Sequence, residues 1–144
     1  MKAAIWLRVA SVLTLLHGVL HEVNDFFGKP EPGPQTAAIS AMKLNSFVLM
    51  GESRTFWDFY RGFSYLGGIS LIVEAIVFWQ LASLARRNTP GLWPVIATFA
   101  FSFVATSLIA YKFLIPPPAI MELVIAACLG AAAIASRKSE KFPA

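Results

Sequence analysis

The chain is short of charged residues and of cysteine, and each shortage excludes a class of protein. Charged residues make up 14% of the 144 residues, while hydrophobic residues make up 57%. One small soluble core could not bury this much apolar surface. The lone cysteine, Cys128, allows no disulfide framework, dithiol redox pair or all-cysteine metal site within one chain. The composition therefore predicts an integral membrane protein.

Four apolar segments are long enough to cross a hydrocarbon layer of roughly 30 Å as helices. They are predicted at about residues 3–23, 62–85, 92–115 and 119–136. The alternation of apolar and polar residues that is typical of strands is absent, which favours helices over a barrel. No small-residue cleavage site follows the first segment, so it is interpreted as a retained signal anchor. We expect an all-α, four-helix membrane bundle that forms a single domain over residues 1–144.

Lysine and arginine collect on one side of the predicted bundle, and this bias sets its orientation. An even number of spans places both termini on that side together with the loop at residues 86–91. It is therefore predicted to be cytoplasmic, with the chain in a bacterial inner membrane. Nothing in the sequence forms a basic aromatic surface, so no nucleic-acid partner is expected. The basic residues concerned are Lys2, Arg8, Arg86, Arg87, Arg137, Lys138 and Lys141.

The long external segment, residues 24–61, changes composition along its length. Alternate prolines in Gly28–Pro34 predict a stiff linker, because proline removes donors and biases its neighbours toward extended conformations. Apolar residues at helical spacing from Thr36 to Met50 favour an amphipathic helix on the membrane or over the bundle, with a bare loop as the alternative. The aromatic and arginine-rich stretch at residues 54–65 is typical of an aromatic belt with snorkelling arginines.

His17 and His21 lie late in the first span, where a lipid-soluble helix has little use for imidazole. At about 100° per residue they share a face with Ala10, Ser11 and Thr14, so we expect them to face protein. The lipid-facing arc is predicted to carry Ile5, Val9, Val12, Leu13, Leu16, Val19, Leu20 and Val23. Small or polar stripes are predicted to line the other spans and to permit close helix packing: Gly67, Ser70 and Glu74; Thr98, Ser102 and Thr106; Glu122, Ala126, Ala133 and Ser136.

The depth of these residues predicts a polar pocket that opens outward. His17 and Glu122 are expected at similar levels, near the outer ends of their spans. Glu74 lies mid-span, where an ionised carboxylate is costly, so it should be protonated, paired or beside a water-filled cavity. The candidate pocket residues are His17, His21, Glu74, Glu122, Arg61 and Tyr65.

Several chemistries are compatible with such a pocket. Histidines at i and i+4 can share a divalent metal ion, and Glu122 or Glu74 can complete a set of two histidines and one carboxylate. A haem held by two histidines would need a partner from another span, and the chain has no third histidine. A histidine and a glutamate can also bind or protonate a quinone or a lipid headgroup. In the remaining interpretation, His17 and His21 form hydrogen bonds across helices and only fix the bundle.

Three features together resemble a family of small four-span bacterial membrane proteins of unknown function. They are the histidine pair, residues 51–64 ahead of the second span, and residues 111–118 after the third. The size and span number are also similar to the broader DoxX-like group. The resemblance implies the architecture and no activity.

Two functions follow as hypotheses. The first is a non-catalytic membrane component or subunit that binds lipid, or packs against a membrane partner or a second copy through the small-residue stripe of Ala127, Ala131 and Ala135. The second is a metal- or quinone-dependent activity in the outward pocket. Transport is a third possibility, and four spans would require oligomerisation for a gated path.

Overall fold

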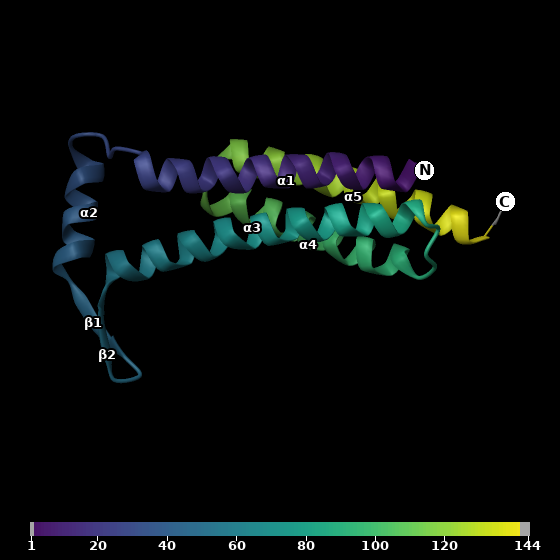
Figure 1. The fold of residues 1–144 in the computed structure, drawn as a ribbon. Helices are drawn as coiled ribbons and strands as arrows, with labels where there is room; N and C mark the ends of the chain where they lie inside the picture. The colour runs from purple at the N-terminus through teal and green to yellow at the C-terminus, as the bar shows by residue number, and fades with distance from the viewer. Residues whose placement is uncertain (1, 142–144) are drawn as a thin grey trace. The chain divides into compact units, whose positions relative to one another are not determined.

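The computed structural model describes residues 2–141, and this part of the chain is almost entirely helical (Figure 1). Four helices, α1, α3, α4 and α5, are long and apolar enough to cross a membrane. The prediction of an all-α, four-helix bundle-like membrane protein is confirmed. The elements are α1 (Lys2–Phe27), α2 (Pro34–Leu44), β1 (Ser46–Leu49), β2 (Glu52–Thr55), α3 (Phe56–Arg86), α4 (Leu92–Phe113) and α5 (Pro116–Lys141).

The long helices differ from the predicted spans mainly at the external segment. α1 continues past Val23 to Phe27, and α3 begins at Phe56 instead of residue 62. A capping box explains the early start of α3. The Asp58 amide donates to Thr55 Oγ1 at 3.0 Å, and the Thr55 amide donates to the Asp58 carboxylate at 3.0 Å. The loop predicted for residues 24–61 is therefore helical at both ends.

The predicted amphipathic helix over Thr36–Met50 is only partly correct. α2 ends at Leu44, and the chain then forms the antiparallel β1–β2 hairpin. Leu49 pairs with Glu52, and the two residues between them, Met50 and Gly51, have positive φ angles of 55° and 88°. Positive φ at both central residues is typical of the type I′ hairpin turn. The hairpin was not predicted, because methionine is an unusual residue for such a turn and gave no turn signal.

The chain divides into two compact units, which are described separately. The first comprises α1 up to His17 and the described residues from Leu71 onward, and the second comprises Gly18–Ser70. Both α1 and α3 contribute to each unit. The boundaries between the units therefore fall within continuous helices.

Apolar side chains from all four long helices form the core of the first unit. Phe78 is fully buried and packs edge-on against Phe99, with ring centroids 5.1 Å apart. The prediction for α1 is confirmed here, since Ala10, Ser11 and Thr14 are buried. The side chains predicted to face lipid, from Ile5 to Leu16, are mostly exposed. The largest fully buried side chains are Phe78, Leu7, Ile96, Ile125, Leu129 and Thr14.

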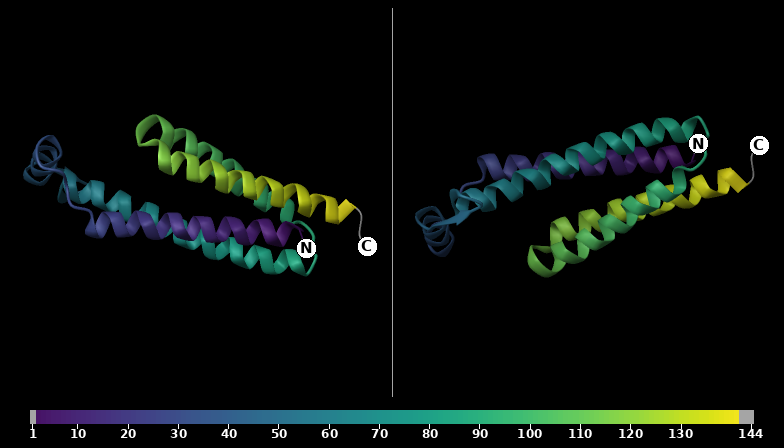
Figure 2. Two further views of the ribbon diagram at one scale, coloured as in Figure 1. Left: turned by 90° about the horizontal axis from the view of Figure 1, so that it is seen from above. Right: turned by 90° about the horizontal axis from the view of Figure 1, so that it is seen from below.

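Hydroxyl groups join neighbouring helices of the first unit. Ser11 Oγ donates to the Ala75 carbonyl oxygen at 2.6 Å, which links α1 to α3. Ser107 Oγ donates to the Ala119 carbonyl oxygen at 2.7 Å, and α4 and α5 run antiparallel, side by side (Figures 1 and 2). These bonds satisfy polar side chains that would otherwise be costly between membrane helices.

The predicted polar stripes have mixed outcomes. On α5, Ala126, Ala133 and Ser136 are buried as predicted. The stripe on α4 was wrong for Thr98 and Ser102, which are exposed. Thr106 is also exposed, but its side chain interacts with Glu122 of α5. Thr98 Oγ1 donates to the Pro94 carbonyl oxygen one turn earlier, at 3.0 Å. A hydroxyl that donates its hydrogen bond to its own helix does not require a partner on a neighbouring helix.

The stripe on α3 was also wrong at its two small residues. Gly67 and Ser70 are exposed, and only Glu74 is half-buried. In the first unit α3 buries alanines and Phe78. α3 therefore packs through a face that lies next to the predicted one on the helix surface.

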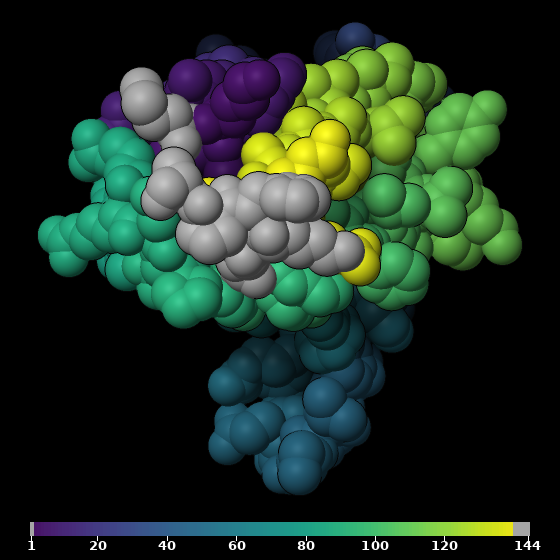
Figure 3. All heavy atoms as spheres, turned by 90° about the vertical axis from the view of Figure 1, so that its right-hand side faces the viewer, coloured from purple at the N-terminus to yellow at the C-terminus, as the bar shows by residue number. Residues whose placement is uncertain are grey.

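The helix ends of the first unit bring its basic residues to one side. The start of α1, the α3–α4 connection and the end of α5 lie at the same end of this unit (Figure 1), and Figure 3 views that end directly. Arg137 lies over the Trp93 ring at 5.1 Å. Lys2, Arg86, Arg87 and Lys138 belong to the same helix ends.

In the second unit, the end of α1 and the start of α3 run antiparallel, with α2 and the hairpin across them (Figures 1 and 2). The rings of Phe26 and Tyr65 stack at 5.1 Å and connect the two long helices. Phe47 of β1 lies against both Phe56 and Phe59 of α3. This aromatic packing attaches the hairpin to the first turns of α3.

Candidate functional site

The six residues of the predicted pocket are distributed over both units. His17, Glu74 and Glu122 belong to the first unit, whereas His21, Arg61 and Tyr65 belong to the second. Each group is described within its own unit below.

In the first unit, Glu74 of α3 and Glu122 of α5 are half-buried. The Thr106 side chain also interacts with the Glu122 carboxyl group. His17 is half-buried on the same face of α1 as the buried Thr14. That these carboxyl groups line one polar pocket with His17 stays a prediction.

In the second unit, His21 is fixed by the backbone of α3. Its Nε2 atom lies 3.0 Å from the Ser64 carbonyl oxygen and 3.2 Å from Ser64 Oγ. A carbonyl oxygen can only accept, so Nε2 carries the proton in this arrangement. For His21 the structure agrees with the interpretation in which the histidine bonds across helices.

Arg61 lies among aromatic rings rather than reaching only to water. Its guanidinium carbon is 4.5 Å from the Tyr65 ring centroid, and the rings of Phe26 and Trp57 lie at 5.9 and 5.8 Å. The same guanidinium donates to the Asp25 carbonyl oxygen. Cation–π contacts of this kind stabilise a cation that is partly removed from water. Arg61 and Tyr65 therefore link α1 and α3 within the second unit.

Two carboxylates of this unit were not among the predicted site residues. Within the described residues, Glu22 Oε1 and Asp25 Oδ2 are buried oxygens with no hydrogen-bond partner. Glu22 reaches α3 at Gly68, where an added Cβ would lie 1.8 Å from Oε1. The signal in the sequence was the spacing of His21, Glu22 and Asp25, which places all three on one helical face.

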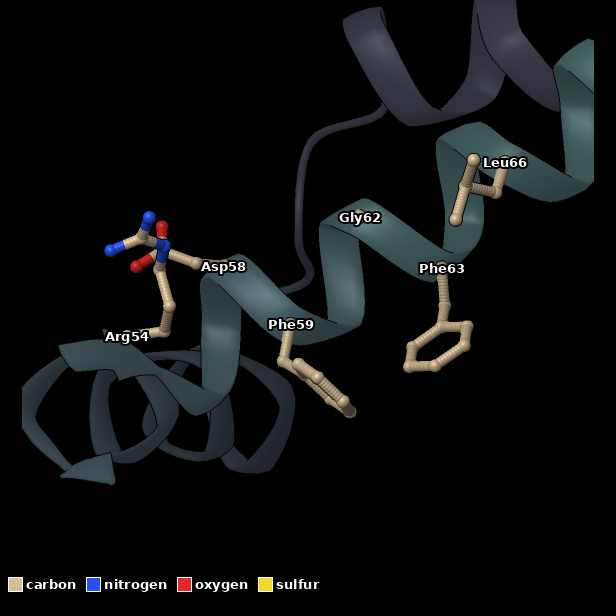
Figure 4. A pocket seen from close by; sticks show the side chains of 6 residues that line it. All are labelled: Arg54, Asp58, Phe59, Gly62, Phe63 and Leu66. Carbon is tan, nitrogen blue, oxygen red and sulfur yellow. The ribbon is translucent and has the colours of Figure 1, made fainter. Parts of the chain in front are cut away.

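A groove along the start of α3 is a feature that sequence reasoning did not identify. It has a volume of about 280 Å³ and runs from two charged residues, Arg54 and Asp58, to Leu66 (Figure 4). The missing side chain of Gly62 leaves its middle open, because nothing lies within 4 Å of a Cβ placed there. The remaining lining residues are Phe59 and Phe63.

The spacing of these residues shows how the groove arises. Residues 58, 62 and 66 recur every four positions, and 59 and 63 lie beside them on the same side of the helix. Phe59 and Phe63 are in edge-to-face contact at 4.8 Å. Arg54 comes from β2, where it bonds to Glu52 at 3.2 Å. The stretch was predicted as a general aromatic belt, and the gap left by Gly62 was the overlooked signal.

The chemistry of the site can now be compared with the predictions. Within the described residues, no group of three or more histidine, cysteine, aspartate and glutamate side chains is placed to hold a metal ion. No family model, curated protein or solved structure matches the chain. Its function must therefore be inferred from the geometry alone.

Proposed function

We propose that this multi-pass membrane protein is a non-catalytic membrane component that binds a membrane phospholipid in the groove of α3. The observation that carries the proposal is the form of the groove, which is apolar along most of its length and charged at one end. A phospholipid has the same division between its acyl chain and its headgroup.

The groove supplies two kinds of contact. Phe59, Phe63 and Leu66 offer an acyl chain an apolar surface, and Phe63 is 62% exposed and free to make it. Arg54 can donate to a lipid phosphate. Lipid tails are already in an apolar solvent, so the affinity must come from close packing and from the headgroup rather than from the hydrophobic effect.

The setting of this function is also proposed. The basic residues at one end of the first unit favour a cytoplasmic location for both termini, since cytoplasmic loops are enriched in lysine and arginine. The groove would then face the outer side of a bacterial inner membrane. We further propose that the chain belongs to the small four-span family that its sequence resembles.

Filling the groove tests the proposal. Gly62→Leu places a side chain in open space within the groove, so it should obstruct a lipid without displacing other residues. Native mass spectrometry of protein extracted with its lipids should show phospholipid retention about tenfold weaker, which corresponds to about 1.4 kcal/mol.

Gly67→Leu is the matched control. Gly67 is also helical, and a Cβ there likewise meets nothing within 4 Å. At about 100° per residue it points well away from Gly62. Equal lipid retention by the two variants would contradict the proposal.

A further inference from the structure

The tip of the β1–β2 hairpin exposes three consecutive apolar side chains. Val48, Leu49 and Met50 are 72%, 51% and 97% exposed. A contiguous apolar patch on a segment outside the spans is typical of a surface that contacts another molecule or a membrane.

Met50 also has an unusual backbone conformation. Its φ of 55° lies in the left-handed region, where asparagine, aspartate and glycine are the favoured residues in hairpin turns. Methionine gains nothing from this conformation. The most exposed of the three apolar side chains therefore stands at a position that the turn itself does not favour for methionine.

The attachment of the hairpin fixes the level of its tip. β2 ends at Thr55 and α3 begins at Phe56 with no linker, and the Phe56 amide donates to the Asn45 carbonyl oxygen at 3.2 Å. The hairpin runs across the axis of α3 (Figure 1). A segment that runs across a membrane-spanning helix at its end lies along the membrane surface.

The two strands differ in a way that suits this position. β1 carries Phe47, Val48 and Leu49, whereas β2 carries Glu52, Ser53 and Arg54. One edge of the hairpin is thus apolar and the other is polar, as in segments that lie in the interface between water and hydrocarbon.

From these observations we propose that Val48, Leu49 and Met50 insert into the interfacial layer of the bilayer that the same chain spans. The ligand of this surface is the phospholipid layer, and Met50 is its deepest contact. This inference requires only the membrane-spanning helices and is independent of the lipid groove.

Site-specific labelling tests the insertion. Cys128 is the only cysteine, so a Cys128→Ala chain that carries Met50→Cys can be labelled at one place with an environment-sensitive fluorophore. In phospholipid vesicles we expect blue-shifted emission and several-fold stronger quenching by lipids that carry a nitroxide on the acyl chain than for the same label at Ser53→Cys. Ser53 is exposed on the polar strand and is the matched control.

Two results would overturn the inference. One is equal quenching of the labels at positions 50 and 53. The other is a label at position 50 that is shielded from water in detergent and becomes exposed when the protein is diluted. That result would assign the tip to an interface between copies of the chain. Unchanged folding of both labelled chains, checked by circular dichroism, excludes a trivial loss of structure.

Discussion

The two units of this protein use their side chains differently, although they share the helices α1 and α3. In the first unit, α3 buries Ala75, Phe78 and Ala82 in an apolar core. In the second unit, the same helix exposes Phe63 and holds Arg61 among aromatic rings. The close apolar packing of the core and the exposed, aromatic stretch that forms the groove therefore lie in different parts of one helix.

The largest difference in stability is expected between alanine substitutions of two phenylalanines of α3, one in each unit. Phe78→Ala removes a fully buried ring that packs against Phe99 and Phe103, and should lower the free energy of unfolding by roughly 3–5 kcal/mol. Phe63→Ala removes an exposed ring and should cost less than about 1 kcal/mol. Reversible unfolding in mixed detergent micelles measures both. Similar losses would remove the proposed division between the units.

A smaller effect is expected from alanine substitutions at two neighbouring glycines of α3. These substitutions sharpen the comparison between the units, because they test whether the second unit also contains close packing. Gly68→Ala places a Cβ against the flexible Glu22 side chain, which must turn aside, and should destabilise the protein by about 1 kcal/mol. Gly67→Ala, one residue earlier, enters open space and should be neutral or slightly stabilising. Thermal unfolding of the two variants in the same detergent makes the comparison. A harmless alanine at position 68 would show that Glu22 moves aside freely.

The smallest effect is expected from single hydroxyl groups in the first unit. Ser11→Ala removes the bond to the Ala75 carbonyl oxygen, and should cost about 0.6 kcal/mol, the usual size of such bonds between membrane helices. Thr98→Val removes a hydroxyl that bonds only within its own helix and should change stability by less than that. The same micelle unfolding assay applies. A larger loss from the valine variant would mean that the exposed face of α4 contributes to packing.

The sequence was sufficient for the spans because length and hydropathy determine them directly. The buried face of α1 was also predictable, because its small residues and its large aliphatic residues segregate at helical spacing. The stripe on α3 was not, because the helix packs through Ala75 and Phe78 on a neighbouring face. The stripe on α4 was not, because a threonine hydroxyl can bond to its own helix, as that of Thr98 does, as well as to a neighbour. Polarity alone does not tell the two cases apart.

The candidate site was only partly predictable. His21, Arg61 and Tyr65 lie in the second unit, and this unit also buries carboxyl oxygens of Glu22 and Asp25, which were not predicted as site residues. Their roles depend on which α3 residues lie opposite them, and that register is not encoded in either helix alone. The hairpin was missed because its turn uses Met50, a residue that carries no turn signal.

The boundaries between the two units fall at His17–Gly18 and Ser70–Leu71, inside helices rather than in loops. A protease that cuts the exposed linker between α1 and α2 would therefore separate the chain into two fragments without releasing either unit. Each unit would still contain residues from both fragments. Cleavage at a loop therefore cannot yield the two units as independent pieces.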